Sequence, residues 1–213
     1  MKSILVTGFE PFQQDVINPS WEIAQALEGW QLGNCTVRAI RLPVSFDDSV
    51  AYLKQALKTW QPDYVICLGV AANRNAISIE RIAINVNDAI IPDNLGKQPI
   101  DQPIDPHGAA AFFSTLPIKA IFQKLRQENI AVELSNTAGT YVCNHVFYHL
   151  MSMIQHTQVK GGFIHVPALP EMLDPNSVIR GINLDTQIKA IRFSIETILN
   201  DDSDVKVAAG AIS

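Results

Sequence analysis

The chain has 213 residues, of which 47% are hydrophobic and 17% charged, as in a globular protein with a sizeable core. Its formal net charge of −5 argues against nucleic acid or an anionic membrane as the main partner, because both require a basic surface. We also expect no secretory signal and no membrane span, since every apolar run is too short. Three unevenly spaced cysteines indicate neither a disulfide framework nor a zinc site, so a cytosolic location is expected.

Apolar runs and helical patterns alternate along the chain. In chain order, the patterns predict a strand at 3–7, a helix at 19–27, a strand at 36–42, a helix at 46–60, a strand at 64–68, a helix at 116–127, a strand at 130–134, a helix at 144–156, a strand at 162–166 and a helix at 185–199. Residues 64–68 are apolar almost throughout, as is typical of a buried central parallel strand. We therefore expect one α/β domain over residues 1–213, with helices on both faces of a mainly parallel sheet.

Two segments fall outside this alternation. Residues 92–108 contain four prolines and two glycines, which predicts a surface loop. The chain after Asn200 is rich in aspartate, and we expect it to be frayed.

Cys143 differs from the other two cysteines in its position. Cys35 and Cys67 lie in or beside predicted strands, where buried structural thiols are common. Cys143 follows a polar, glycine-containing loop and opens a predicted helix. Unpaired backbone N–H groups and the helix dipole favour a thiolate there, so a low pKa and a nucleophilic role are expected, with a structural thiol as the alternative.

His165 is the histidine best placed to serve as a base. It ends the predicted strand at 162–166, and if the flanking strands are parallel, helix starts and strand ends share one edge of the sheet. Cys143 and His165 would then form a thiol–imidazole pair. His145 and His149 are spaced i and i+4 and could bind a metal, but no third ligand is evident, so we expect satisfied helix histidines and no metal site.

Glu80 lies where the apolar alternation changes phase. Ile77 and Ile79 alternate in one phase and the residues after Arg81 in the other, which predicts a β-bulge at this point. A carboxylate in such an apolar stretch needs a partner. It could form a structural ion pair, with Arg81 or another residue, or it could orient the imidazole of His165.

A substrate pocket can also be outlined. The first predicted strand ends in the segment GFEPF, which places Phe9 and Phe12 at the same edge of the sheet. The segment lacks the glycine pattern of a dinucleotide or phosphate loop. Two aromatic rings and a proline would form an apolar wall, and Asn18 could donate a directional hydrogen bond.

The chain resembles the pyroglutamyl-peptidase I family, also called pyrrolidone-carboxylate peptidase, along nearly its full length. The resemblance is carried by four segments: VTGFEPF with INPSW in 6–21, GVAANRNAISIERIAIN in 69–85, ELSNTAGTYVCNH in 133–145 and GFIHVPALPE in 162–171. It implies a three-layer α/β/α sandwich, no cofactor, a cytoplasmic location, a homotetramer and peptides capped by pyroglutamate as substrates. It also implies Cys143 as nucleophile, His165 as general base and acid, and Glu80 as the group that orients the histidine.

The resemblance extends to the pocket, with two departures. Its motif positions imply a pyroglutamyl pocket lined by Phe9, Phe12, Asn18, Ile91, Tyr141 and Val142. Many members have Arg where this chain has Ile90, and Gln where it has Val70, so a cation near the site is expected to be missing. Two alternatives follow: a homologue that binds such peptides without turnover, and a cysteine hydrolase of another amide.

Overall fold

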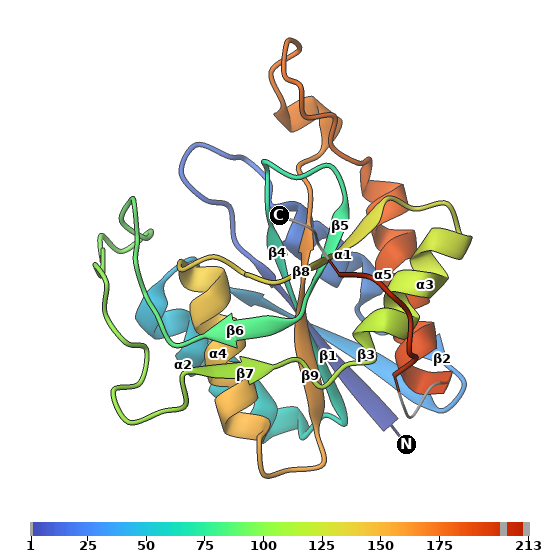
Figure 1. The fold of residues 1–213 in the computed structure, drawn as a ribbon, viewed down its shortest axis with the longest axis horizontal. Coiled ribbons are helices and arrows are strands. Elements are labelled where there is room, and N and C mark those ends of the chain that lie inside the picture. The colour runs from blue at the N-terminus through green and yellow to red at the C-terminus, as the bar shows by residue number, and fades with distance from the viewer. Residues whose placement is uncertain (1, 201–203, 211–213) are drawn as a thin grey trace.

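A seven-stranded sheet forms the centre of the molecule in the computed structural model, which describes residues 2–200 and 204–210 (Figure 1). The strand order is β2-β3-β1-β4-β9-β5-β8. The strands are β1 (Lys2–Phe9), β2 (Gln31–Leu32), β3 (Cys35–Leu42), β4 (Tyr64–Val70), β5 (Ile77–Glu80), β8 (Val132–Ser135) and β9 (Lys160–Val166). Strands β3, β1, β4 and β9 are parallel to one another, whereas β5 and β8 run in the opposite direction. The expected mainly parallel sheet is confirmed.

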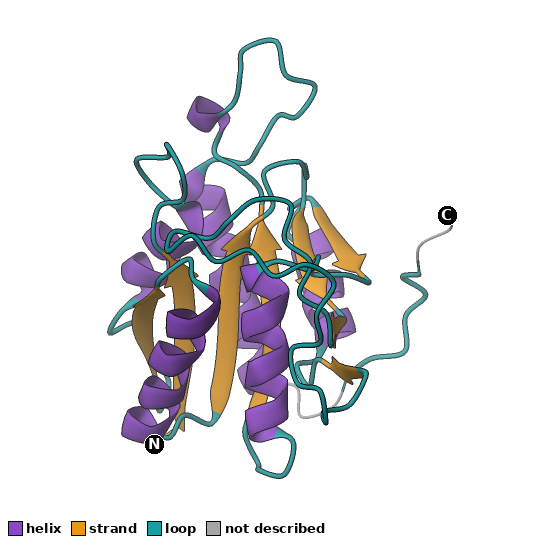
Figure 2. Ribbon diagram, turned by 90° about the vertical axis from the view of Figure 1, so that its left-hand side faces the viewer, coloured by secondary structure: helices purple, strands orange, loops and turns teal. Residues whose placement is uncertain are grey.

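Helices cover both faces of this sheet (Figure 2). They are α1 (Pro19–Leu27), α2 (Phe46–Trp60), α3 (Ile118–Gln127), α4 (Val142–Ile154) and α5 (Leu184–Asn200), and a short 3₁₀ helix, η1, spans Pro170–Met172. The core is divided accordingly: residues of α1, α3 and α5 pack on one face, and residues of α2 and α4 on the other. The three-layer α/β/α sandwich is therefore confirmed.

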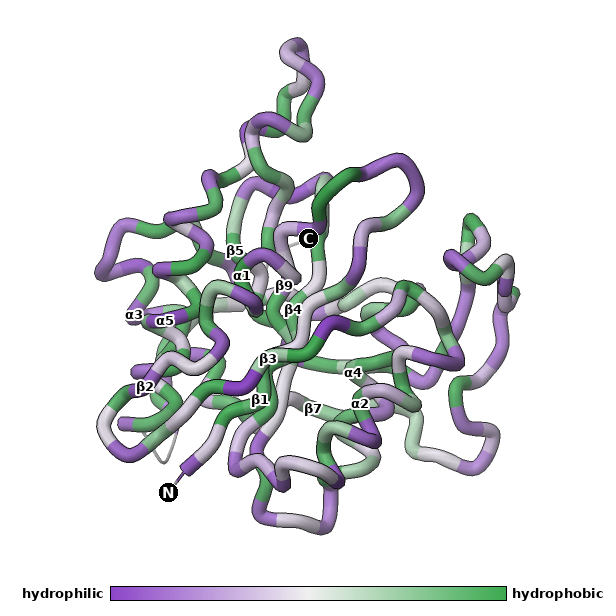
Figure 3. Tube along the Cα trace, turned by 180° about the vertical axis from the view of Figure 1, so that it is seen from behind, coloured by the Kyte–Doolittle hydropathy of each residue, from purple (hydrophilic) through white to green (hydrophobic). Residues whose placement is uncertain are grey.

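Side-chain alternation explains why the sheet separates the two cores. In β4, Ile66 and Leu68 point to the α1–α3–α5 side, while Val65 and Cys67 point to the α2–α4 side. Both sets are fully buried, as a strand covered on both faces requires. Figure 3 shows hydrophobic residues gathered in the strands at the centre of the molecule. No helix in the described part of the chain is long and apolar enough to cross a bilayer.

The predicted bulge at Glu80 is a break between two sheets. β5 ends at Glu80, and β6 (Ile82–Ile84) pairs with β7 (Ala111–Phe113) in a separate antiparallel ribbon in contact with α4 (Figure 1). Arg81 links the two, since its N–H donates to Ser135 O and its carbonyl accepts from Ser114 N. The change of phase thus marks a change of sheet, so the bulge prediction is wrong, although it located the discontinuity correctly.

The segment after α5 differs from the expected frayed end. Asp204 accepts hydrogen bonds from the backbone N–H groups of Lys119 and Ala120, in the first turn of α3, and Lys119 Nζ donates to Val207 O at 2.8 Å. A carboxylate suits a helix N-terminus, where backbone N–H groups lack partners. Residues 204–207 are therefore fixed to α3, while Asp201 and Asp202 lie outside the described residues.

Candidate active site

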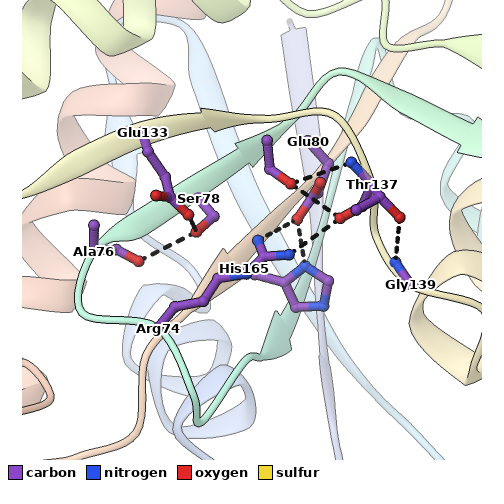
Figure 4. Close-up of polar contacts among 9 residues, drawn as sticks. Arg74, Ala76, Ser78, Glu80, Glu133, Thr137, Gly139 and His165 are labelled. Atoms are coloured by element: carbon purple, nitrogen blue, oxygen red, sulfur yellow. Dashed lines mark hydrogen bonds and ion pairs between the residues drawn. The ribbon is translucent and has the colours of Figure 1, made fainter. Parts of the chain in front are cut away.

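Glu80 and His165 form a buried pair at the boundary between β5 and β9 (Figure 4). Nδ1 of His165 lies 2.7 Å from Oε1 of Glu80, and the two residues are 4% and 0% exposed. With Nδ1 facing a carboxylate, the ring carries its proton there and leaves Nε2 available as an acceptor. A carboxylate that fixes the tautomer of an imidazole is the arrangement that a general base needs.

Cys143 lies in the first turn of α4 and approaches the same place. Its Sγ lies against Gly69, where a Cβ atom would come within 2.8 Å of the sulfur and of the Phe163 ring. Gly69 in turn pairs with His165 in the register of β4 and β9. A glycine at residue 69 therefore allows the thiol to sit directly over the sheet beside the histidine strand.

The route by which Cys143 reaches this edge differs from the expected one. A shared edge was predicted on the condition that the strand before the cysteine helix is parallel to the histidine strand. That strand is β8, which runs parallel to β5 and so antiparallel to β9. The premise is wrong, but β8 has only four residues, and the loop at 136–141 carries the chain back to the cysteine helix.

Arg74 is a member of the site that the sequence argument did not single out. Its Nη1 lies 2.7 Å from Glu80 Oε1, and its Nη2 donates to Thr137 O at 3.1 Å. Arg81, the suggested ion-pair partner, instead donates to Asn136 Oδ1. Glu80 thus makes both of the suggested contacts, an ion pair with an arginine and a hydrogen bond with His165. The only signal for Arg74 was its presence in the segment GVAANRN before β5.

A pocket of about 220 Å³ opens beside Cys143. It is largely apolar and brings together five of the six predicted substrate-binding residues, namely Phe9, Phe12, Asn18, Tyr141 and Val142. The Phe12 and Tyr141 rings are in contact, with centroids 5.7 Å apart. Further residues of the lining were not predicted from the sequence, among them Ile17, Val44, Ala72 and Met172.

Asn18 and Ile91 have different positions relative to this pocket. Asn18 caps α1, since its Oδ1 accepts from Ser20 and its Nδ2 donates to Glu10 O, which uses one of the two amide hydrogens. Ile91 is 38% exposed on the adjacent loop and is not part of the pocket lining. The loop is nevertheless tied to the pocket, because Tyr141 donates its hydroxyl to Pro92 O.

Known proteins resemble this chain along nearly its whole length. Residues 2–201 match the profile of the pyroglutamyl peptidase family. The chain belongs to this family. It is 47% identical to a pyrrolidone-carboxylate peptidase of Escherichia fergusonii, with 99% of each chain covered, and 45% identical to one of Brevibacillus brevis over the full length of both.

Solved structures of the family show the same fold. The crystal structure of pyroglutamyl peptidase I from Bacillus amyloliquefaciens covers 96% of this chain and 100% of its own, with a TM-score of 0.93 and 41% identity. Pyrrolidone carboxyl peptidase from Thermococcus litoralis has a TM-score of 0.93 at 38% identity, covering 97% and 99% of the two chains. The expected family is confirmed.

The resting thiol of this pyroglutamyl peptidase family member is not the low-pKa thiolate expected from its helix. Burial raises the pKa of Cys143 to about 12, with further increases from Glu80 and Cys67 and an opposing effect of Arg74. The free-energy cost of burying a thiolate exceeds the stabilisation that the helix N-terminus gives it. The expectation of a lowered pKa for Cys143 is therefore wrong. A neutral thiol must lose its proton as it attacks, which makes a neighbouring base essential.

His145 is a buried structural histidine. Its Nδ1 lies 3.0–3.1 Å from the side-chain amide of Asn87, and its ring contacts Phe46 and His149. Burial, and then His149 and Lys97, lower its pKa to about 3, although Asp47 and a hydrogen bond with the Phe46 backbone oppose this. Among the described residues, no three His, Cys, Asp or Glu side chains form a group suited to a metal ion.

The lowered pKa of His145 predicts acid sensitivity. The unfolded chain binds a proton at His145 near its ordinary pKa of 6.5, whereas the folded chain does so only near 3, so stability is lost as pH falls through this window. From pH 7 to pH 5 this group should remove about 2 kcal/mol from the free energy of unfolding. Urea unfolding at the two pH values measures this fall in the free energy of unfolding. His145→Gln should make the fall smaller by about that amount. His156→Gln, at an exposed position, should leave it unchanged.

The two departures from the family pattern have different consequences. Val70 lines the pocket, but Ile90 is 94% exposed and lies outside the lining. The site also contains a cation, because Arg74 forms an ion pair with Glu80. We therefore expect Ile90→Arg to change kcat/KM by no more than about twofold, as for a surface substitution. A gain of tenfold or more on a pyroglutamyl amide would show that the loop brings residue 90 to the site.

Proposed function

We propose that the chain is a cysteine exopeptidase that removes the N-terminal pyroglutamyl residue from peptides. The observation that carries this proposal is the small aromatic pocket that ends at Cys143, beside the buried Glu80–His165 pair. The roles of these three residues follow from it: nucleophile for Cys143, general base and acid for His165, and orienting carboxylate for Glu80.

Substrate recognition is argued from the chemistry of the pocket. A pyroglutamyl end is a neutral lactam, so a site for it needs apolar walls and a few hydrogen bonds rather than an anchor for an ammonium group. Phe9, Phe12 and Tyr141 supply the walls, and the second amide hydrogen of Asn18 can be donated to a lactam carbonyl. Asp15, the carboxylate that also lines the pocket, is exposed to solvent. Ile91 is proposed to add apolar surface from the neighbouring loop.

The reaction follows in two steps. Cys143 transfers its proton to His165 Nε2 while the sulfur attacks the pyroglutamyl carbonyl carbon, and the resulting imidazolium is stabilised by Glu80. The C–N bond then breaks as His165 returns the proton to the departing amine, which leaves an acyl-thioester. Water, deprotonated by His165, attacks this thioester and releases pyroglutamate and the thiol. No cofactor is needed for either step.

The start of α4 supports a site for the oxyanion. Tyr141 is the N-cap residue of α4, and its side chain makes no capping hydrogen bond. The first N–H groups of a helix have no intrahelical partner, and their dipole favours negative charge. Val142 and Cys143 line the pocket, so we propose that their backbone N–H groups bind the developing oxyanion.

The test is hydrolysis of a pyroglutamyl amide compared with prolyl and glutaminyl amides. We expect release of amine from the pyroglutamyl amide alone, abolished by a thiol alkylator. Binding of the pyroglutamyl compound without release of amine would instead identify a non-catalytic homologue. Equal turnover of the prolyl or glutaminyl amide would identify a different amidase.

Assembly and location are further parts of the proposal. A homotetramer is supported by exposed apolar side chains on the 85–110 segment, Leu95 and Ile100, which are more than 65% exposed in the single chain. Light scattering should give four times the mass of one chain. A cytoplasmic location is supported by three free cysteines, one of which must remain reduced to act. The seven-stranded sheet, whose strands come from the whole of residues 2–166, supports one peptidase domain.

A further inference from the structure

Arg74 connects the two halves of the site. Its guanidinium contacts Glu80 Oε1 through Nη1, and Thr137 O through Nη2 (Figure 4). Thr137 belongs to the loop at 136–141, which leads directly into the helix of Cys143. The guanidinium of Arg74 therefore joins the carboxylate that contacts His165 to the loop that precedes Cys143 in the chain.

The contacts of Glu80 make this connection important for the histidine. Oε1 receives both Arg74 Nη1 and His165 Nδ1, each at 2.7 Å, while Oε2 is buried and receives no hydrogen bond from the described residues. A single hydrogen bond to Oε1 would leave the Glu80 carboxylate free to rotate about the bond that joins it to the side chain. A second contact to the same oxygen restricts this rotation. The guanidinium provides this contact.

Building on the proposed function, we propose that Arg74 is a positioning residue for the Glu80–His165 pair and for the cysteine loop. It is not part of the pocket lining, and it acts by holding Glu80 Oε1 under His165 Nδ1 and Thr137 at a fixed distance from it. Glu80 can then stabilise the imidazolium that forms when Cys143 transfers its proton. Ser135 supports the same carbonyl, since its Oγ also donates to Thr137 O.

The geometry requires arginine rather than a cation in general. Two acceptors, a carboxylate oxygen and a main-chain carbonyl, are bound by two different nitrogens of one rigid fork. A lysine ammonium has the charge but cannot reproduce the fork. Arg74 is also 23% exposed, so its removal leaves a less severe defect in packing than loss of a core residue would.

The alternative is a purely structural ion pair that stabilises the fold without affecting the reaction. The experiment is a double-mutant cycle on the full chain with a pyroglutamyl amide, using Arg74→Met, Glu80→Gln and the double variant. Arg81→Met is the matched control, because Arg81 contacts the neighbouring residue of the same loop, Asn136, and not Glu80. Thermal unfolding of each variant measures the structural contribution separately.

We expect Arg74→Met to lower kcat by roughly 10- to 100-fold with little change in KM, as for outer groups that hold an orienting residue in place. In the Glu80→Gln background the same change should cost clearly less, because the carboxylate through which Arg74 holds His165 is gone and only the contact with Thr137 remains to be lost. Arg74→Lys should lie between Arg74→Met and the unsubstituted chain. Arg81→Met should keep its kcat within about twofold.

Two outcomes would overturn the proposal. One is equal loss of kcat in both backgrounds, and the other is a lowered thermal midpoint with kcat per folded molecule unchanged. Failure of the proposed function is recognised separately: the unsubstituted chain would then release no amine, or Cys143→Ala would retain activity, whatever the Arg74 variants do.

Discussion

Cys143→Ala should abolish release of amine from a pyroglutamyl amide, with a loss on the order of 10⁴- to 10⁶-fold, as for removal of the nucleophile in other covalent hydrolases. Without the sulfur, no acyl-enzyme can form, and the pocket can only bind. The fold should be retained, because alanine is a good helix residue and Cys143 is only partly buried. Steady-state kinetics together with thermal unfolding measure both effects.

Cys35→Ala and Cys67→Ala are the matched controls for this substitution. Both thiols are buried and lie in strands, away from the pocket lining. Cys67 is 0% exposed and does not line the pocket, so a substrate cannot reach its thiol. Turnover per folded molecule should be nearly unchanged in both variants. More than a trace of activity in Cys143→Ala would contradict the proposed mechanism.

Glu80→Gln should lower kcat by up to about 10⁴-fold and leave KM nearly unchanged. The amide oxygen can still accept the Nδ1 proton of His165, but it cannot stabilise the imidazolium that forms as Cys143 loses its proton. The effect should be large here because burial raises the pKa of Cys143 to about 12. Its proton is therefore transferred readily only if the carboxylate stabilises the imidazolium that accepts it.

Glu133→Gln is the control for the loss of a carboxylate on the same sheet. Glu133 lies on β8, is exposed, and accepts a hydrogen bond from Ser78 of β5 at 2.6 Å. Its replacement should leave kcat within about twofold. If Glu80→Gln also kept its kcat, Glu80 would be a structural partner of Arg74 and not part of the catalytic machinery.

Much of the fold could be predicted because its signals are local. The bounds of α1 and α2 agree with the sequence patterns at both ends, since Asn18 and Ser45 each accept an N-cap hydrogen bond at the helix start. Strand direction has no such signal. Nothing within Val132–Ser135 encodes that β8 runs against β9, because this depends on which neighbour the strand pairs with.

In the candidate site, too, some features have a local sequence signal and others depend on long-range contacts. Cys143 and His165 could be selected from the sequence because a helix start and a strand end are visible there, and Glu80 because a charge interrupts an apolar run. Arg74 could not be selected, since an arginine in a loop looks like a solvated surface residue until its partners are known. The expected low pKa of Cys143 failed for a related reason: the helix start is local, whereas the burial that outweighs it comes from the whole fold.

The sequence by itself determined the family, the α/β class and the residues that carry the proposed chemistry, because residue types, periodicity and caps act over a few neighbouring positions. Tertiary structure alone decided how those residues meet. It placed Cys143 against Gly69, joined Glu80 to both His165 and Arg74, and left Ile90 in solvent. These contacts join residues up to 85 positions apart, and their energies depend on packing and desolvation that no local pattern records.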